Sequence, residues 1–88
     1  MYKVIFSNAA KKQIKKLDRG VQILLIAWLE KNIEGCENPR NLGKALSANH
    51  RCKWRYRIGA CRVLCEIVDE QVIVYVLEVG HRSRVYKN

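Results

Sequence analysis

The fold is decided by Trp54-Arg55-Tyr56-Arg57-Ile58-Gly59-Ala60-Cys61-Arg62-Val63-Leu64-Cys65-Glu66-Ile67, a stretch that predicts two strands joined by a tight turn. Apolar and charged residues alternate over 54–58, which is the period-2 pattern of a strand with one apolar and one charged face. Gly59-Ala60 is a Gly-X pair, and glycine supplies the positive φ that a type II′ hairpin turn needs at its first central residue. The stretch therefore predicts a β-hairpin.

The register of this hairpin brings three arginines to one face. The turn predicts that Arg57 pairs with Arg62, and Arg55 lies two residues before Arg57 on the same face. Like charges directly opposite each other destabilise a strand pair by up to about 1 kcal/mol. We therefore expect this face to hold an anion. The alternative is an ordinary polar strand face whose arginines pair with Glu66 and Glu78.

The composition limits the class of protein. The 88 residues include 17 Lys and Arg against 8 Asp and Glu, which gives a formal net charge of +9. Hydrophobic residues at 49% and charged residues at 28% are globular values, and the length predicts one domain over residues 1–88. The positive excess favours a polyanionic partner, either nucleic acid or an acidic protein.

The cysteines are interpreted as reduced thiols. Cys36, Cys52, Cys61 and Cys65 contain no CxxC pair, so the spacing predicts no zinc site and no metal. The N-terminus has no signal peptide, and no apolar run is long enough to cross a bilayer. We therefore expect a cytoplasmic protein with no membrane partner.

One strand and two helices are predicted before the hairpin. Residues 2–6 form the strand, and Ser7 or Asn8 caps a helix that runs to Leu17. Apolar residues at helical spacing predict the second helix over 21–34, ended by Gly35 in the left-handed region. The outer side of the first helix carries four lysines that either form a solvated face or contact RNA phosphates: Lys11, Lys12, Lys15 and Lys16.

A loop and a further strand complete the predicted fold. Residues 36–51 form the loop, which Leu42 and Leu46 attach to the core. Residues 72–79 are apolar on both faces, as in a central strand covered on two sides. A basic tail follows Gly80. The element order is β-α-α-β-β-β, an α+β domain with two N-terminal helices packed on an antiparallel sheet.

The chain resembles the RelE/ParE toxin superfamily, and within it the RelE branch of bacterial type II toxin–antitoxin systems. The resemblance rests on the element order, on the hairpin 54–63, and on the ending Val79-Gly80-His81-Arg82-Ser83-Arg84-Val85-Tyr86. It covers essentially the whole chain. It implies a ribosome-dependent endoribonuclease that cleaves mRNA in the 30S A site without a metal or other cofactor. In that reaction the ribose 2′-hydroxyl attacks the adjacent phosphate.

The resemblance also implies site residues. Arg55 and Arg57 fall where RelE-type toxins place basic residues on the second strand, and Arg62 matches the arginine that opens the third. Arg82 matches the arginine just past the last strand, and Tyr86 the tyrosine near the C-terminus. The expected catalytic residues are Arg57, Arg62, His81, Arg82 and Tyr86, and the expected RNA-binding residues are Lys11, Lys12, Lys15, Lys16, Lys53, Arg55 and Arg84.

The general base is the point at which this sequence departs from its relatives. Some relatives carry lysine where this chain has Arg55 and Arg57, and arginine effectively never loses its proton. Tyr86 is then a candidate base if surrounding cations lower its pKa. His81 is a second candidate, since an unperturbed histidine titrates near pH 6.5. Arg82 is expected to stabilise the leaving group.

Two other functions are compatible with the sequence. A ParE-like toxin would bind DNA gyrase without nuclease activity, and would not need the Arg and Tyr constellation. A plain RNA-binding module, or a DNA-binding module that depends on an antitoxin, would use the basic first helix equally well. The resemblance further implies a monomeric toxin that a cognate, RelB-like antitoxin keeps inert by covering its basic surface.

Overall fold

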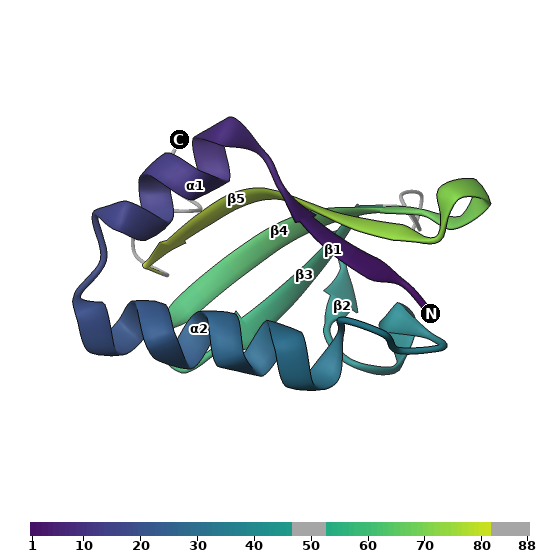
Figure 1. The fold of residues 1–88 in the computed structure, drawn as a ribbon, viewed down its shortest axis with the longest axis horizontal. Coiled ribbons are helices and arrows are strands. Elements are labelled where there is room, and N and C mark those ends of the chain that lie inside the picture. Colours follow the sequence, from purple (N-terminus) through teal and green to yellow (C-terminus); the bar gives the residue numbers. More distant parts are fainter. Residues whose placement is uncertain (47–52, 82–88) are drawn as a thin grey trace.

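Five strands form a mixed sheet in the part of the chain that the structure describes, and two helices cover one of its faces (Figure 1). The structure is a computed structural model and describes residues 1–46 and 53–81. The strand order is β1-β5-β4-β3-β2. The elements are β1 (Lys3–Phe6), α1 (Asn8–Lys15), α2 (Arg19–Asn32), η1 (Pro39–Asn41), β2 (Lys44–Ala45), β3 (Lys53–Ile58), β4 (Cys61–Val68), η2 (Asp69–Gln71) and β5 (Ile73–His81).

The predicted α+β class is confirmed, but the prediction of an antiparallel sheet is wrong at one edge. β1 pairs with β5 in parallel, with Lys3 opposite Ile73 and Phe6 opposite Val76. The other three strand pairings are antiparallel. A period-2 pattern identifies a strand but not its partner or direction, and the partner of β1 is the last strand of the sheet.

The hairpin is confirmed in its register and in its turn. Arg57 pairs with Arg62, and Ile58 pairs with Cys61 next to the turn. Gly59 has φ +60°, as the first central residue of a type II′ turn requires. An ideal Cβ at Gly59 would come no closer than 3.8 Å to Leu24, so the turn needs glycine for its backbone conformation and not for space.

The two helices begin and end close to their predicted bounds. Ser7 caps α1, since its hydroxyl accepts a hydrogen bond from the Ala10 N–H at 3.0 Å. Gly35 lies beyond α2 with φ +79°, as predicted. The predicted apolar stripe of α2 is wrong at Leu24, which is 55% exposed.

The segment between α2 and the hairpin is attached differently from the prediction. Leu42 and Leu46 are exposed. The attachment is made by buried Pro39, whose carbonyl accepts a hydrogen bond from the buried Tyr56 hydroxyl at 2.6 Å. The predicted loop also contains β2, which is too short for a pattern to reveal and pairs with Trp54 and Arg55.

β5 lies inside the sheet, but it is not covered on two sides as predicted. Val74, Val76 and Val79 are buried, whereas Tyr75 is 38% exposed. The helices of the described ranges cover the face that carries the valines, and none of them covers the other face, which we call the open face (Figure 1). The spacing from Val76 to Val79 breaks the period of two because the β4–β5 register shifts there, with Leu64 opposite Glu78 and Cys65 opposite Val76.

The core lies between the helices and the inward face of the sheet. Its buried residues in the described ranges are Ala10, Ile14, Leu25, Leu29, Ile33, Tyr56, Ile58, Cys61, Val63, Cys65, Ile67, Val74, Val76 and Val79. Burial raises the pKa of the Cys65 thiol to about 12, and it also raises the pKa of Cys61. Both thiols are therefore protonated at neutral pH and behave as small apolar side chains.

Burial of the Cys65 thiol predicts a loss of stability at alkaline pH. Above about pH 9 the unfolded chain releases this proton while the folded chain keeps it up to about pH 12, so the free energy of unfolding falls as pH rises. The slope for one such group is about 1.4 kcal/mol per pH unit. Between pH 8 and pH 10.5, urea denaturation of the wild type should lose roughly 2 kcal/mol more than that of Cys65→Val. Equal losses in the two proteins would contradict this assignment.

Candidate nucleic-acid interface

The open face of the sheet carries a basic patch formed by β2, β3 and the start of β4. We call it the open-face patch; its residues are Lys44, Lys53, Arg55, Arg57 and Arg62. Residues paired across strands share a face, and the register pairs Arg55 with Lys44 on one side and Leu64 on the other. These side chains therefore project away from the helices, opposite the buried Tyr56 and Val63.

Within the open-face patch, Arg57 and Arg62 lie directly opposite each other on β3 and β4, and they are the pair of cations with the shortest expected Cα–Cα distance. In a two-residue hairpin the pair beside the turn exchanges the hydrogen bonds, so the next pair is non-hydrogen-bonded, with Cα atoms roughly 4.5 Å apart. Arg57 is exposed, whereas Arg62 is half-buried and its Nε atom is buried. The two guanidiniums start from adjacent backbone positions, and packing restrains one of them.

Lys44 is a member of the patch that the sequence did not reveal. It lies in a two-residue strand within the predicted loop, and only its pairing with Arg55 brings it to the open face. Lys53 is the first residue of β3, at the end away from the hairpin turn, and it forms an ion pair with Glu66 at 3.4 Å. Both side chains of this pair are more than a third exposed, so the pair contributes little stability and can open to release the lysine.

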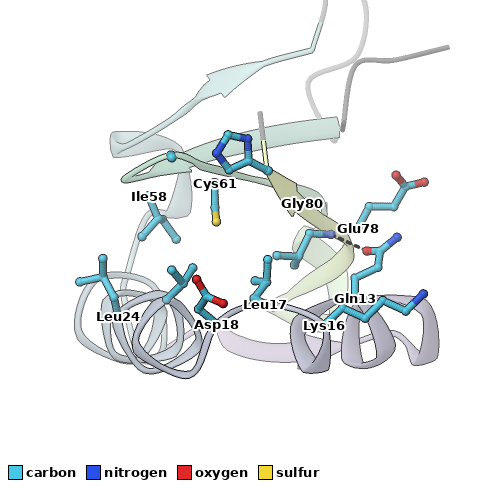
Figure 2. Close-up of a pocket in the computed structure, with 13 residues that line it drawn as sticks. Gln13, Lys16, Leu17, Asp18, Leu24, Ile58, Cys61, Glu78 and Gly80 are labelled. Carbon is cyan, nitrogen blue, oxygen red and sulfur yellow. Dashed lines mark hydrogen bonds between the residues drawn. The ribbon is translucent and has the colours of Figure 1, made fainter. Parts of the chain in front are cut away.

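His81 lies on the other side of the sheet from Arg57 and Arg62. It pairs with Cys61, whose thiol points toward the helices (Figure 2). His81 is also one of the residues that line a groove of about 810 Å³. The groove separates the hairpin and the end of β5 from the helices. Its lining is Gln13, Lys16, Leu17, Asp18, Val21, Leu24, Ile58, Ala60, Cys61, Glu78, Val79, Gly80 and His81. The structure therefore does not bring His81 beside the arginine pair.

The predicted lysines of α1 form a second basic surface. Lys11, Lys12, Lys15 and Lys16 are all exposed, as predicted. However, α1 packs on the helix-covered side of the sheet, against β5. These lysines consequently do not join the open-face patch. Arg82, Arg84 and Tyr86, which complete the predicted site, lie outside the described residues.

Arg57 and Arg62 have the chemistry needed to stabilise a phosphorane. Guanidiniums stay charged at all physiological pH values and match phosphate oxygens in bidentate geometry. In residues 1–46 and 53–81 no three His, Cys, Asp or Glu side chains gather as metal ligands would. No helix in those ranges has the length and apolar character needed to cross a bilayer.

The fold and the basic open sheet face define a RelE-type domain. The toxin–antitoxin complex RelBE2 from Mycobacterium tuberculosis contains a chain of this fold, with 27% identity and a TM-score of 0.80 over 93% of this chain and 92% of that chain. The isolated RelE toxin of Escherichia coli gives 26% identity and a TM-score of 0.71, over 98% and 92% of the two chains.

Sequence comparison gives the same assignment. The mRNA interferase toxin RelE of Escherichia coli strain K12 is 32% identical over 84 residues, which is 94% of this chain and 85% of the relative. The chain belongs to the RelE/ParE toxin superfamily, through the family described as ParE toxin of type II toxin–antitoxin system, parDE, which matches residues 4–86. It is a toxin of a type II toxin–antitoxin system.

Proposed function

We propose that this toxin is a ribosome-dependent endoribonuclease that cleaves mRNA in the 30S A site. The observation that carries the proposal is the pairing of Arg57 with Arg62 on the open face of the sheet. Such a pair costs stability, and a bound phosphate would offset that cost. The relative that is named an mRNA interferase supports the same activity.

The proposed reaction needs no metal. The ribose 2′-oxygen attacks the adjacent phosphorus, and the bond from phosphorus to the 5′-oxygen of the next nucleotide breaks. The products are a 2′,3′-cyclic phosphate and a 5′-hydroxyl, which takes up a proton. Arg57 and Arg62 would stabilise the negative charge that develops on the pentavalent phosphorus, because they are fixed cations in place before the attack.

Proton transfer is assigned to residues other than the arginine pair, because arginine cannot act as a base. Tyr86 remains the first candidate to accept the 2′-hydroxyl proton, and Arg82 the candidate to stabilise the leaving oxygen. His81 would need to reach around the end of β5 to act, since it pairs with Cys61 on the helix side. We therefore rank Tyr86 above His81.

RNA binding is assigned to the remaining cations. Lys53 and Arg55, with Lys44, would hold the mRNA backbone beside the arginine pair, and Arg84 would extend this contact. The lysines of α1 face elsewhere, so they would contact a separate segment of RNA, as a toxin seated in a ribosomal cleft requires. Such phosphate contacts weaken as salt concentration rises.

We further propose that a cognate, RelB-like antitoxin holds the toxin inert. The structural relatives include toxin–antitoxin complexes, and a net charge of +9 favours an acidic partner. An acidic or amphipathic segment over the open-face patch would block RNA and relieve the repulsion between the arginines. We expect a monomeric, cytoplasmic toxin within that complex.

The proposed function is tested by incubating purified toxin with mRNA-programmed ribosomes and, separately, with the same mRNA alone. We expect cleavage on the ribosome only, with 2′,3′-cyclic phosphate and 5′-hydroxyl ends. Cleavage of free mRNA at the same rate would contradict ribosome dependence. Ends carrying a 5′-phosphate would contradict the proposed attack by the 2′-hydroxyl.

Inhibition of DNA gyrase is the second candidate function, and the match to the ParE toxin family favours it. A gyrase inhibitor works by protein contact and does not need an arginine pair that binds phosphate. Inhibited supercoiling by purified gyrase, together with intact mRNA on toxin-treated ribosomes, would select this candidate over the nuclease.

A further inference from the structure

We propose that Ser7 and Gln13 are positioning residues that hold the bulge in β5. The bulge in turn determines which β5 residue lies opposite Arg62. The proposal rests on the proposed nuclease function. It concerns hydrogen bonds between α1 and β5 that lie on the opposite side of the sheet from the open-face patch.

The bulge changes the partner of Arg62. From Val68 to Cys65, β4 pairs with β5 in one register, and a continuation of that register would place Val79 opposite Arg62 and Glu78 opposite buried Val63. The register shift after Cys65 instead places Gly80 opposite Arg62 and Val79 opposite Val63. Glu78 is thereby directed away from the helices, as Figure 2 shows.

The shift also removes a bulky neighbour from the arginine pair. Without it, the branched side chain of Val79 would project beside Arg62 on the open face. With it, the position beside Arg62 is a glycine, which has no side chain to occupy the space that a phosphate would need. The bulge therefore leaves no β5 side chain directly opposite Arg62.

Three hydrogen bonds from α1 and its cap hold the bulge. The Ser7 N–H donates to the Val76 carbonyl at 2.9 Å, and the Ser7 hydroxyl donates to the Leu77 carbonyl at 2.9 Å. The Gln13 side-chain oxygen accepts from the Val79 N–H at 2.7 Å (Figure 2). A bulge interrupts the ladder and leaves backbone groups that need other partners, and α1 supplies them.

The residue types match this task. Gln13 is half-buried on the side of α1 that faces the sheet, where an apolar residue would otherwise pack, and its amide oxygen is used by Val79. The Ser7 hydroxyl acts in both directions, because it accepts from the Ala10 N–H as the helix cap while it donates to Leu77. The first role needs only an acceptor, whereas the second needs a side-chain donor, which the Ser7 hydroxyl supplies.

Gln13 is tested with a pair of variants of similar size. Gln13→Met removes the acceptor, and Gln13→Glu keeps an oxygen that accepts from the Val79 N–H. In Gln13→Met, we expect the Val79 amide to exchange its hydrogen about tenfold faster, as the loss of one hydrogen bond implies. The rate of mRNA cleavage on ribosomes at saturating toxin should fall about tenfold, with the half-saturating toxin concentration unchanged within twofold. Gln13→Glu should behave as the wild type in all three measurements.

Ser7 is tested with variants that both cap α1. Ser7→Asp keeps the acceptor for Ala10 but has no donor for the Leu77 carbonyl, whereas Ser7→Thr keeps both. We expect the saturating cleavage rate to fall about tenfold in Ser7→Asp and to stay within twofold in Ser7→Thr, at a temperature where thermal unfolding shows both to be folded.

Three results would overturn the proposal. Unchanged Val79 exchange in Gln13→Met would show that Gln13 does not hold the bulge. Faster exchange with a wild-type cleavage rate would show that the bulge does not position the site. An equal loss of cleavage in Ser7→Thr and Ser7→Asp would show that the donor to Leu77 is not the cause. If the wild type does not cleave mRNA at all, the proposed function fails, and the exchange measurement alone decides whether Gln13 holds the bulge.

Discussion

Arg62→Ala is expected to lower the rate of mRNA cleavage on the ribosome about 10²–10³-fold, the typical loss when one fixed group that stabilises transition-state charge is removed. Arg62 is the restrained member of the arginine pair, since its Nε atom is buried and its strand lies at the centre of the sheet. The same substitution removes the repulsion from Arg57. The free energy of unfolding should therefore stay unchanged or rise by up to about 1 kcal/mol. Cleavage kinetics and urea denaturation measure the two effects separately.

Two control variants separate geometry from charge. Arg62→Lys keeps the positive charge but loses the planar fork, so we expect an intermediate loss of cleavage. Arg19→Ala removes one charge from the first turn of α2, on the helix side of the sheet, and should cleave within about threefold of the wild type. If Arg19→Ala loses as much activity as Arg62→Ala, the effect comes from net charge, and the open-face patch is not the site.

Local sequence was enough to predict the hairpin and the basic face that it carries. Gly59 fixes the turn, the turn fixes the register, and the register places Arg57 against Arg62. Each step involves residues within ten positions of one another. The helices were predicted for the same reason, because their apolar spacing and the Ser7 cap are local features.

The long-range features of the sheet were not predictable in this way. β1 finds its partner in β5 at the far end of the chain, and β2 is too short to show a pattern. The sequence does not reveal the bulge in β5, because β5 has apolar residues on both faces and shows no change of pattern at the bulge. The residues that stabilise the bulge, Ser7 and Gln13, also lie more than sixty residues earlier in the chain.

The unpredicted bulge explains the unexpected position of His81. Counting by twos from Tyr75, which faces the open side, places residue 81 on the same face as Arg62. The extra residue in β5 reverses the alternation, so that His81 pairs with Cys61 and is one of the residues that line the groove. The residue types of the candidate site were therefore recognisable from the sequence, but the side of the sheet that each one occupies depended on a tertiary contact.

Gly43→Ala is expected to destabilise the protein by about 3 kcal/mol, the largest loss that we expect from a single methyl group. Gly43 has φ +78°, a backbone conformation that alanine adopts only with strain. A Cβ there would lie 2.7 Å from the Trp54 Nε1 atom and 2.8 Å from the Tyr56 Cδ1 atom, and closer still to the Arg55 carbonyl oxygen. None of these distances is tolerable, so β3 or the preceding turn must move. The midpoint of thermal unfolding should fall by roughly 15 °C.

Gly20→Ala is the matched control, because it adds the same methyl group where nothing lies within 4 Å. Gly20 is in the first turn of α2, and alanine there should raise the free energy of unfolding by a few tenths of a kcal/mol to about 1 kcal/mol. Gly43 immediately precedes Lys44, whose pairing with Arg55 extends the open-face patch. A Gly43→Ala protein as stable as Gly20→Ala would show that β2 does not lie this close to β3, and Lys44 would then no longer belong to the RNA-binding surface.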